Sequence, residues 1–340
     1  MSARRKVLVL FCGGTIIMKK ARHGGLEVPS KAEAVRILRA IEPRLSEIAD
    51  FRIRYVENID STNMTPRNWD RIIGEIGRHY RSYDGFVITH GTDTMAYTAA
   101  ALSLGLGNLG KPVVLTGSQI PGWEIDTDAR RNLVNAMKLA VREAAGVYVV
   151  FDERVIRGSR ASKASESKLD AFTSVNAPDA GEIRVGIRLD RGLPRRRAGA
   201  PDLRPGFASD IFVTTLVPGA DPGDLIFLLD DSRIRGIVIQ AYGTGNVPYE
   251  FDAFFRLARK NRVPVVVTSQ CLHGMTRMKS YDVGRRALKL GVIEGFDQSL
   301  EMLTVKLMWA LERYSYDKIR EVMTTDFAGE LDTSTRPEGR

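Results

Sequence analysis

Four apolar runs of the sequence are each followed by a short segment of glycine, threonine, serine and aspartate residues. These segments are residues 12–16, 90–95, 116–121 and 243–248. A threonine hydroxyl is a poor nucleophile until a neighbouring group takes its proton, and the backbone N–H groups of glycine-rich turns suit an oxyanion. If these segments act chemically, their hydroxyls and backbone N–H groups are the groups that would act.

Each segment also has a purely structural explanation, which is favoured when the segment is considered by itself. Glycine after a strand makes a tight turn, and Ser, Thr or Asp beside it caps a helix. The run Gly13-Gly14-Thr15 is not a phosphate-binding P-loop, because no Gly-Lys-Ser or Gly-Lys-Thr follows it. A GxGxxG match at residues 105–110 ends a predicted helix and precedes a strand, so we predict a helix-to-strand turn there rather than a dinucleotide site.

The apolar runs alternate with amphipathic stretches, which indicates repeated β-α-β order and a mostly parallel sheet with helices on both faces. In such sheets, ligands bind beyond the carboxyl ends of the strands. Ser30 is expected to begin a helix with Glu33 in a capping box, and Pro43 to interrupt that helix. The predicted strands are residues 7–12, 51–59, 85–90, 112–117, 146–151, 211–217, 236–241 and 265–270, and the predicted helices are residues 30–49, 66–80, 95–106, 129–144, 251–260, 283–289 and 300–313, with one more that begins at Asp221.

The periodicity stops between residues 189 and 209, where Pro, Gly and Arg dominate. We therefore predict a larger N-terminal α/β catalytic domain at residues 1–190, a linker at 191–208 and a smaller C-terminal α/β domain at 209–340. The tail from Leu331 is expected to be frayed.

The composition is that of an ordinary globular protein: 44% of the 340 residues are hydrophobic and 27% are charged. The basic N-terminus leads directly into a short strand-like run, which predicts a cytoplasmic protein without a signal peptide or membrane span. The net charge is +9, and much of the excess lies in residues 184–204. For that stretch a solvated connector is favoured over a nucleic-acid-binding surface.

The cysteine and histidine residues do not form a metal or disulfide pattern. The two cysteines, Cys12 and Cys271, and the four histidines show no zinc spacing. We interpret Cys271 as a buried small residue rather than as a nucleophile paired with His273. Neither a metal nor an organic cofactor is predicted.

Taken together and in order, these segments resemble the bacterial and archaeal L-asparaginase family of the cytoplasmic (type I) kind. Residues 12–16 look like its first signature and residues 90–95 like its second. The resemblance extends from about residue 5 to 315 through residues 58–66, 115–119, 128–133, 243–248 and 269–271. It implies the two-domain asparaginase-like fold, hydrolysis of L-asparagine to L-aspartate and ammonia, and a homodimer or homotetramer.

The resemblance also implies four catalytic residues. Thr15 and Thr92 would be the two reactive hydroxyls, and Asp93 would fix the substrate ammonium. Lys163 matches the family's buried lysine, and a lysine that desolvation keeps neutral could take the proton from Thr92 directly or through water. Without the resemblance, a surface lysine in a polar loop explains Lys163 equally well.

Substrate binding is implied for five positions. Ser61 and Thr62 match positions that bind the α-carboxylate, and Ser118 sits where the family places a backbone contact near the leaving amide. Thr92 and Asp93 belong to this set as well. Considered alone, Ser61 is better explained as a turn residue before a helix.

One position departs from the family pattern. The family usually has a tyrosine on a mobile loop about ten residues after the first threonine, and that place falls at Gly25 here. No tyrosine occurs between Thr15 and Tyr55. His23 or Tyr281 could substitute for it, and residues 18–29 suit a lid that closes over substrate.

Two other functions remain open. The first is the glutaminase-like subunit of a tRNA-dependent amidotransferase, which resembles these asparaginases but carries an extra N-terminal domain. Because the first signature comes at residue 12, such a domain is not expected. The second is a non-catalytic, small-ligand-binding sensor on the same fold, which would not need two hydroxyls and a lysine.

Overall fold

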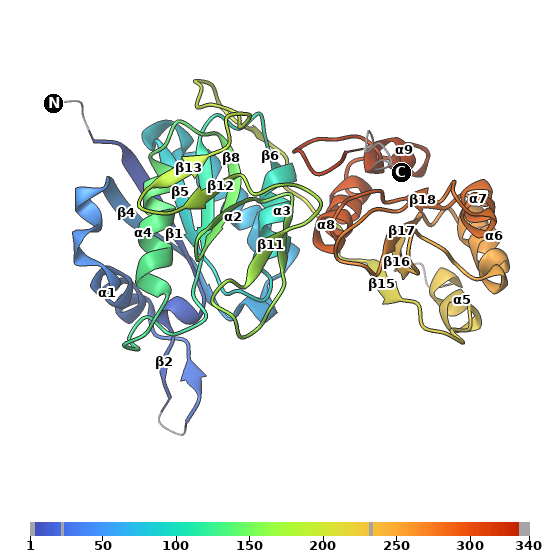
Figure 1. The fold of residues 1–340 in the computed structure, drawn as a ribbon, viewed down its shortest axis with the longest axis horizontal. Helices are drawn as coiled ribbons and strands as arrows, with labels where there is room; N and C mark the ends of the chain where they lie inside the picture. The colour runs from blue at the N-terminus through green and yellow to red at the C-terminus, as the bar shows by residue number, and fades with distance from the viewer. Residues whose placement is uncertain (1–3, 22–23, 231–233, 333–340) are drawn as a thin grey trace. The chain divides into compact units, whose positions relative to one another are not determined.

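The computed structural model describes residues 4–21, 24–230 and 234–332 of the 340-residue chain (Figure 1). Contacts between residues divide the chain into two units, Met1–Pro205 and Gly206–Arg340.

The N-terminal unit is built on an eight-stranded sheet with the order β13-β12-β9-β8-β7-β5-β1-β4. The five strands from β8 to β4 are parallel, which confirms the predicted α/β class. β9, β12 and β13 extend the sheet with antiparallel pairs that were not predicted. The strands are β1 (Lys6–Gly13), β4 (Asp50–Ile59), β5 (Gly85–Thr89), β7 (Pro112–Thr116), β8 (Gly146–Phe151), β9 (Arg154–Arg157), β12 (Gly181–Ile183) and β13 (Ile187–Leu189).

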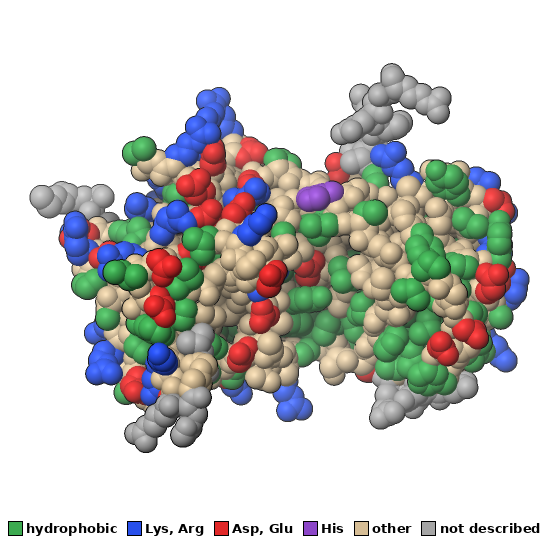
Figure 2. All heavy atoms as spheres, turned by 60° about the horizontal axis from the view of Figure 1, so that its bottom comes forward, with side chains coloured by type: hydrophobic (Ala, Val, Ile, Leu, Met, Phe, Trp, Pro, Cys, Tyr) green, Lys and Arg blue, Asp and Glu red, His purple; other side chains and the backbone are tan. Residues whose placement is uncertain are grey.

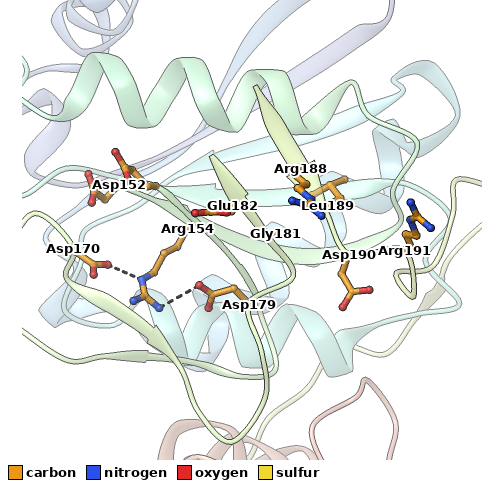
Figure 3. Close-up of a pocket in the computed structure, with 11 residues that line it drawn as sticks. Asp152, Arg154, Asp170, Asp179, Gly181, Glu182, Arg188, Leu189, Asp190 and Arg191 are labelled. Carbon is orange, nitrogen blue, oxygen red and sulfur yellow. Dashed lines mark hydrogen bonds and ion pairs between the residues drawn. The ribbon is translucent and has the colours of Figure 1, made fainter. Parts of the chain in front are cut away.

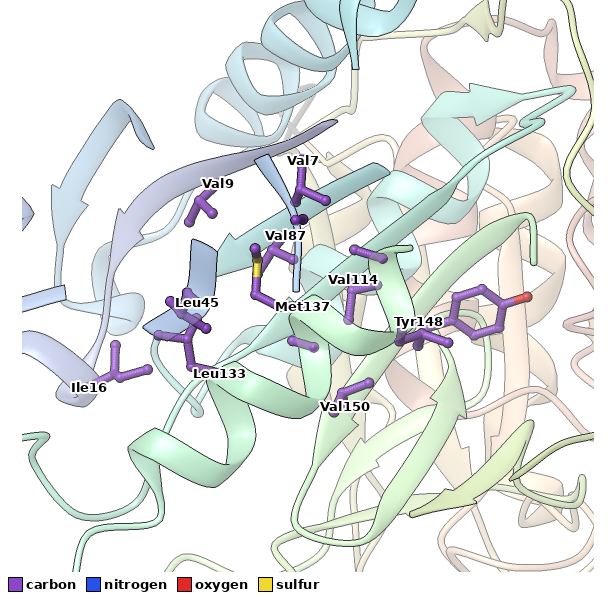
Figure 4. Close-up of a cluster of buried hydrophobic side chains, with 14 of the residues drawn as sticks. Val7, Val9, Ile16, Leu45, Val87, Val114, Leu133, Met137, Tyr148 and Val150 are labelled. Atoms are coloured by element: carbon purple, nitrogen blue, oxygen red, sulfur yellow. The ribbon is translucent and has the colours of Figure 1, made fainter. Parts of the chain in front are cut away.

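Helices cover both faces of this sheet (Figure 1). On one face, α1 and α4 enclose an apolar cluster with alternate residues of the strands, among them Val7 and Val9 of β1 (Figure 4). Burying these side chains contributes roughly 1.5–3 kcal/mol each. On the other face lie α2 and α3. The four helices are α1 (Lys31–Ile41), α2 (Pro66–His79), α3 (Met95–Gly105) and α4 (Ala129–Ala140).

Specific side-chain contacts are found at the ends of two of these helices. α1 begins with the predicted capping box, in which Ser30 and Glu33 bond each other's backbone N–H, and Pro43 begins a separate 3-10 turn. α4 ends at Ala140 rather than at the predicted residue 144. The guanidinium of Arg196 binds the carbonyls of Ala140 and Arg142 at 3.2 and 3.0 Å, so it satisfies acceptors that the helix end leaves open.

The segment predicted as a linker, residues 191–208, runs largely along the N-terminal unit. Arg196 also donates to the carbonyl of Asp84, and β14 (Asp202–Leu203) pairs with β6 (Leu106–Gly107) directly after α3. Part of the basic stretch therefore has a structural role. On the face of the N-terminal unit drawn in Figure 2, basic and acidic side chains are interspersed.

The C-terminal unit contains a four-stranded parallel sheet with the order β15-β16-β17-β18. Its last segment is tied down by a buried ion pair between Lys306 and Glu330 at 2.7 Å. The predicted frayed tail falls mostly on residues 333–340, outside the described part of the chain. The elements are β15 (Ile211–Thr215), α5 (Gly223–Asp230), β16 (Gly236–Ala241), α6 (Asp252–Lys260), β17 (Val265–Ser269), α7 (Asp282–Lys289), β18 (Ile293–Glu294), α8 (Leu300–Leu311) and α9 (Tyr316–Met323), of which β18 and α9 were not predicted.

Both cysteines are free thiols, and they differ in exposure. Cys12 is buried at the end of β1, and burial raises the pKa of its thiol. Cys271 is exposed, so the prediction of a buried residue was wrong. It follows β17 in a bend, where its N–H donates to the hydroxyl of Ser269 at 3.0 Å, and a bend beyond a sheet edge leaves its side chain in solvent.

Candidate active site

The first two signatures meet because β1, β4, β5 and β7 are neighbours in the sheet and end on the same edge. Gly14 packs on the backbone of the second signature so closely that a Cβ there would lie 2.6 Å from the carbonyl oxygen of His90. Gly13 is equally close to the backbone of Ile59, and both glycines have positive φ values, of 103° and 99°. Both the close packing and the positive φ values therefore require glycine at positions 13 and 14, directly before Thr15.

Thr92, Asp93 and Lys163 form one cluster. The Nζ of Lys163 lies 2.8 Å from Oγ1 of Thr92 and 2.5 Å from Oδ1 of Asp93. Thr92 is 7% exposed, whereas the side chains of Lys163 and Asp93 are 17% and 54% exposed. Lysine and threonine thus meet at the wall of the site, and the carboxylate of Asp93 reaches out toward solvent.

A short hairpin carries the lysine to this place. Lys163 is the last residue of β10 (Ala161–Lys163), which pairs with β11 (Phe172–Ser174). The amide of Gln119 donates to the carbonyls of Glu166 and Lys168, at 2.8 and 3.2 Å, in the loop between these strands. The loop after β7 therefore helps to hold the hairpin that presents Lys163.

Thr15 has fewer fixed contacts. It begins a 3-10 turn, Thr15–Ile17, and is half-buried. No side chain within the described ranges lies within hydrogen-bond distance of its hydroxyl. The N–H groups of Thr15 and Thr92 have no acceptor in the described part of the chain, so both remain available to an oxyanion.

Ser61 and Thr62 follow β4 at the same edge. Ser61 is buried, and a Cβ on Gly91 would lie 2.5 Å from its Oγ. The hydroxyl of Thr94 donates to the Ser61 carbonyl at 2.8 Å, which joins this turn to the second signature. Thr62 is exposed, and both its N–H and its hydroxyl donate to Asp60 Oδ1 at 2.9 Å.

Ser118 is buried in the loop after β7, where its hydroxyl donates to the carbonyl of Ile120 at 2.7 Å. The carboxylate of Asp128 accepts the N–H groups of Gln119 and Ile120, both at 3.0 Å. Asn132 donates to Asp128 and to the carbonyl of Gly117. The sequence assigned no role to Asp128 or Asn132. The sequence feature that could have pointed to them is an aspartate at the start of a predicted helix followed by an asparagine one turn later.

The hairpin between β2 (Lys19–Lys20) and β3 (Leu26–Glu27) occupies the predicted lid. Gly25 has a φ of 77°, and its carbonyl accepts the N–H of Ala21 at 3.1 Å. A tyrosine would be strained in this backbone conformation. Of the proposed substitutes, His23 lies outside the described residues, and Tyr281 lies in the C-terminal unit with residues 243–248 and 269–271.

A large hollow of about 940 Å³ lies away from this cluster, at the antiparallel end of the sheet (Figure 3). There Arg154 bridges Asp170 at 2.9 Å and Asp179 at 3.2 Å. None of the proposed site residues lines it. Within the described ranges, no cluster of His, Cys, Asp and Glu could hold a metal ion, and no helix is long and apolar enough to cross a membrane.

Two family models match the chain. Residues 6–195 match the model described as "Asparaginase, N-terminal", and residues 210–323 match "Glutaminase/Asparaginase C-terminal domain".

Similar proteins match over almost the whole chain. An L-asparaginase of Thermococcus kodakarensis is 38% identical over 96% of this chain and 99% of its own. L-asparaginase 1 of Escherichia coli K12 is 36% identical over 96% and 98%. A glutamyl-tRNA(Gln) amidotransferase subunit of Methanosarcina acetivorans is 35% identical over 97% of this chain and 80% of its own.

Solved structures agree with the fold. The thermostable L-asparaginase of Thermococcus kodakarensis superposes with a TM-score of 0.88 and 37% identity over 97% of this chain and 100% of its own. A probable cytoplasmic L-asparaginase of Campylobacter jejuni superposes with a TM-score of 0.79 and 28% identity over 94% and 99%.

Proposed function

The chain belongs to the asparaginase family, and on that premise we infer that it hydrolyses L-asparagine to L-aspartate and ammonia. The observation that supports this function most directly is the contact of Lys163 with both Thr92 and Asp93. A binding protein would not need a lysine against a buried threonine hydroxyl.

We assign the following roles. Lys163 takes the proton of Thr92, and the carboxylate of Asp93 stabilises the charge on Lys163. The activated hydroxyl or a water molecule attacks the side-chain amide carbon, while Thr15 acts on the same carbonyl from the neighbouring strand end. The N–H groups of Thr15 and Thr92 hold the oxyanion. The leaving nitrogen takes the proton back from Lys163 and departs as ammonia when its bond to the carbonyl carbon breaks. If a threonine hydroxyl made the attack, a water molecule then hydrolyses the resulting ester, which releases L-aspartate and restores the hydroxyl.

Substrate binding completes the proposal. Asp93 is exposed enough to receive the α-ammonium of asparagine. Ser61 and Thr62 bind the α-carboxylate, and Ser118 lies near the leaving amide. We further propose that the protein acts in the cytoplasm as a homo-oligomer.

Ammonia release from L-asparagine tests this proposal, with L-glutamine as the second substrate. We expect turnover by the wild type and near-complete loss in Thr15→Ala, Thr92→Val and Lys163→Met. Lys168→Met, an exposed lysine of the same hairpin, is the matched control and should keep full activity. Folded wild type that releases no ammonia from either amide would contradict the proposal.

The amidotransferase subunit remains the second candidate, because the similar amidotransferase subunits are nearly as close in sequence as the asparaginases. In the ammonia-release assay, faster turnover of glutamine than of asparagine would favour this candidate. Tight binding of asparagine without turnover would instead favour the sensor.

A further inference from the structure

His90, the first residue of the second signature, lies in a chain of hydrogen bonds that the roles above do not use. It is 0% exposed and directly follows β5. Its Nδ1 lies 2.7 Å from the carbonyl oxygen of Gly91, and its Nε2 lies 2.9 Å from the hydroxyl of Thr98 on α3. That hydroxyl accepts the indole N–H of Trp69 on α2, at 3.0 Å.

For a neutral imidazole, the donors and acceptors in this chain allow only one arrangement of hydrogens. A carbonyl oxygen can only accept, so Nδ1 of His90 must carry the hydrogen that it donates to Gly91. Nε2 is then the acceptor, and it takes the hydroxyl hydrogen of Thr98. The indole of Trp69 can only donate, which leaves that hydrogen free for this purpose. A neutral imidazole is thereby fixed as its Nδ1–H tautomer.

The bond to the Gly91 carbonyl has a consequence on the other side of the same peptide. The Gly91–Thr92 peptide is trans, so its C=O and N–H groups point in opposite directions. Because the oxygen is held toward the buried imidazole, the N–H of Thr92 is directed away from it. That N–H has no acceptor in the described part of the chain. It belongs to the residue whose hydroxyl contacts Lys163.

We propose that His90 is a positioning residue, which Thr98 and Trp69 hold in one tautomer so that the Thr92 N–H stays aimed at the substrate oxyanion. The proposal rests on the proposed hydrolase function. An oxyanion donor acts most strongly in the transition state, so a loss of its orientation lowers kcat more than it changes KM. Burial lowers the pKa of His90 to about 4, against the opposing effect of the Gly91 contact, so the ring stays neutral near neutral pH.

Two replacements of His90 separate this role from core packing. The amide nitrogen of asparagine can take the place of Nδ1 and donate to Gly91, whereas that of glutamine reaches only the place of Nε2. Asparagine is the smaller side chain and leaves the larger cavity, so it should destabilise the fold more. We expect His90→Gln to lower kcat roughly 10- to 100-fold with KM almost unchanged, and His90→Asn to stay within about threefold of wild type.

The proposal is overturned if the two variants lose kcat equally, or in the order of their melting temperatures. Should either variant fail to fold, Thr98→Val and its control Thr98→Ser address the same chain with little change in volume. We expect the valine variant to lose about 3- to 10-fold in kcat and the serine variant less than about twofold. Equal activity of these two variants would contradict the proposal.

The tautomer can be measured without any assay of activity. In ¹⁵N-histidine spectra of the wild type at pH 7, we expect one histidine with Nδ1 protonated and Nε2 bare, absent from the spectrum of His90→Asn. The Nε2–H tautomer or an imidazolium would refute the hydrogen-bond assignment. If the wild type proves inactive on both amides while the tautomer is as expected, the proposed function fails but the local arrangement stands.

Discussion

The two threonines of the site are held very differently. Thr92 contacts Lys163, follows a fully buried strand and is attached to a peptide whose carbonyl is bound by His90. Thr15 shares the same sheet edge but begins a short turn that leads into the lid hairpin. The difference indicates that the Thr92 side is held by side-chain contacts before substrate arrives, whereas the hydroxyl of Thr15 has no such contact in the described part of the chain.

The hairpin is nevertheless attached at its base. The indole N–H of Trp123 donates to the carbonyl of Met18 at 2.9 Å, and the N–H of Gly122 donates to that of Ile16 at 3.2 Å. The ammonium of Lys19 lies 3.4 Å from Glu27 and 3.2 Å from Glu33. The loop after β7 thus reaches the base of the lid, and α1 holds its first strand.

The largest effect is expected on the organised side. Lys163→Met and Thr92→Val should each lower kcat roughly 10³-fold, and the double variant should be little worse than either single one, because the two groups act in one proton transfer. Steady-state kinetics checks this, with Lys168→Met as the control. Multiplying losses in the double variant would show that the two residues act independently.

A pH effect on stability should come from the same side. The folded pKa of His90 is depressed to about 4, below the ordinary 6.5, so the folded state binds fewer protons than the unfolded state between those values. Stability contributed by His90 is therefore present above pH 6.5 and is lost as the pH falls toward 4, by up to about 3 kcal/mol. Urea unfolding at pH 7 and 4.5 should show a smaller decrease for His90→Asn than for wild type.

A smaller effect is expected at the base of the lid. Trp123→Phe keeps the aromatic ring but removes the donor to Met18, which is worth about 1 kcal/mol. We expect a rise of about three- to fivefold in KM for asparagine, with kcat less affected. A decrease in kcat as large as that of Lys163→Met would mean that the lid is as strictly organised as the Thr92 side.

The smallest effect is expected for the ion pairs of the lid strand. Lys19→Gln removes both ion pairs of an exposed ammonium, and such pairs contribute little in water. KM should change by less than about twofold, and 1 M NaCl should reduce the difference from wild type because salt screens these charges. Measuring KM for the wild type and Lys19→Gln at low salt and in 1 M NaCl tests this prediction.

Sequence patterns predicted the parallel strands, because buried runs such as Val7–Phe11 differ sharply from the turns that follow them. The short strands β9, β12 and β13 carry mixed polar and apolar residues, and only their pairing makes them strands. β18 has only two residues, which is too short for the alternation of polar and apolar residues that predicts a strand. The exposure of Cys271 depends on the direction of the bend in which it lies, and the local sequence does not predict that direction.

For the site, the sequence predicted which residue types lie at the strand ends, and the resemblance supplied their roles. The contact of Lys163 with Thr92 could not be predicted from spacing, because 71 positions separate the two residues. The tautomer of His90 was equally hidden, because it depends on donors from two helices that meet only in the folded chain.

The position of Arg196 has a practical consequence for cutting the protein into pieces. The family model of the first unit ends at residue 195, one residue before the guanidinium that binds carbonyls of Asp84, Ala140 and Arg142. A fragment that stops there would lose the hydrogen bonds of Arg196 and the strand β14, and the carbonyl groups at the end of α4 would be exposed. An autonomous N-terminal fragment should therefore be expressed through Pro205, and Arg196→Met in that longer fragment should make it more sensitive to proteolysis.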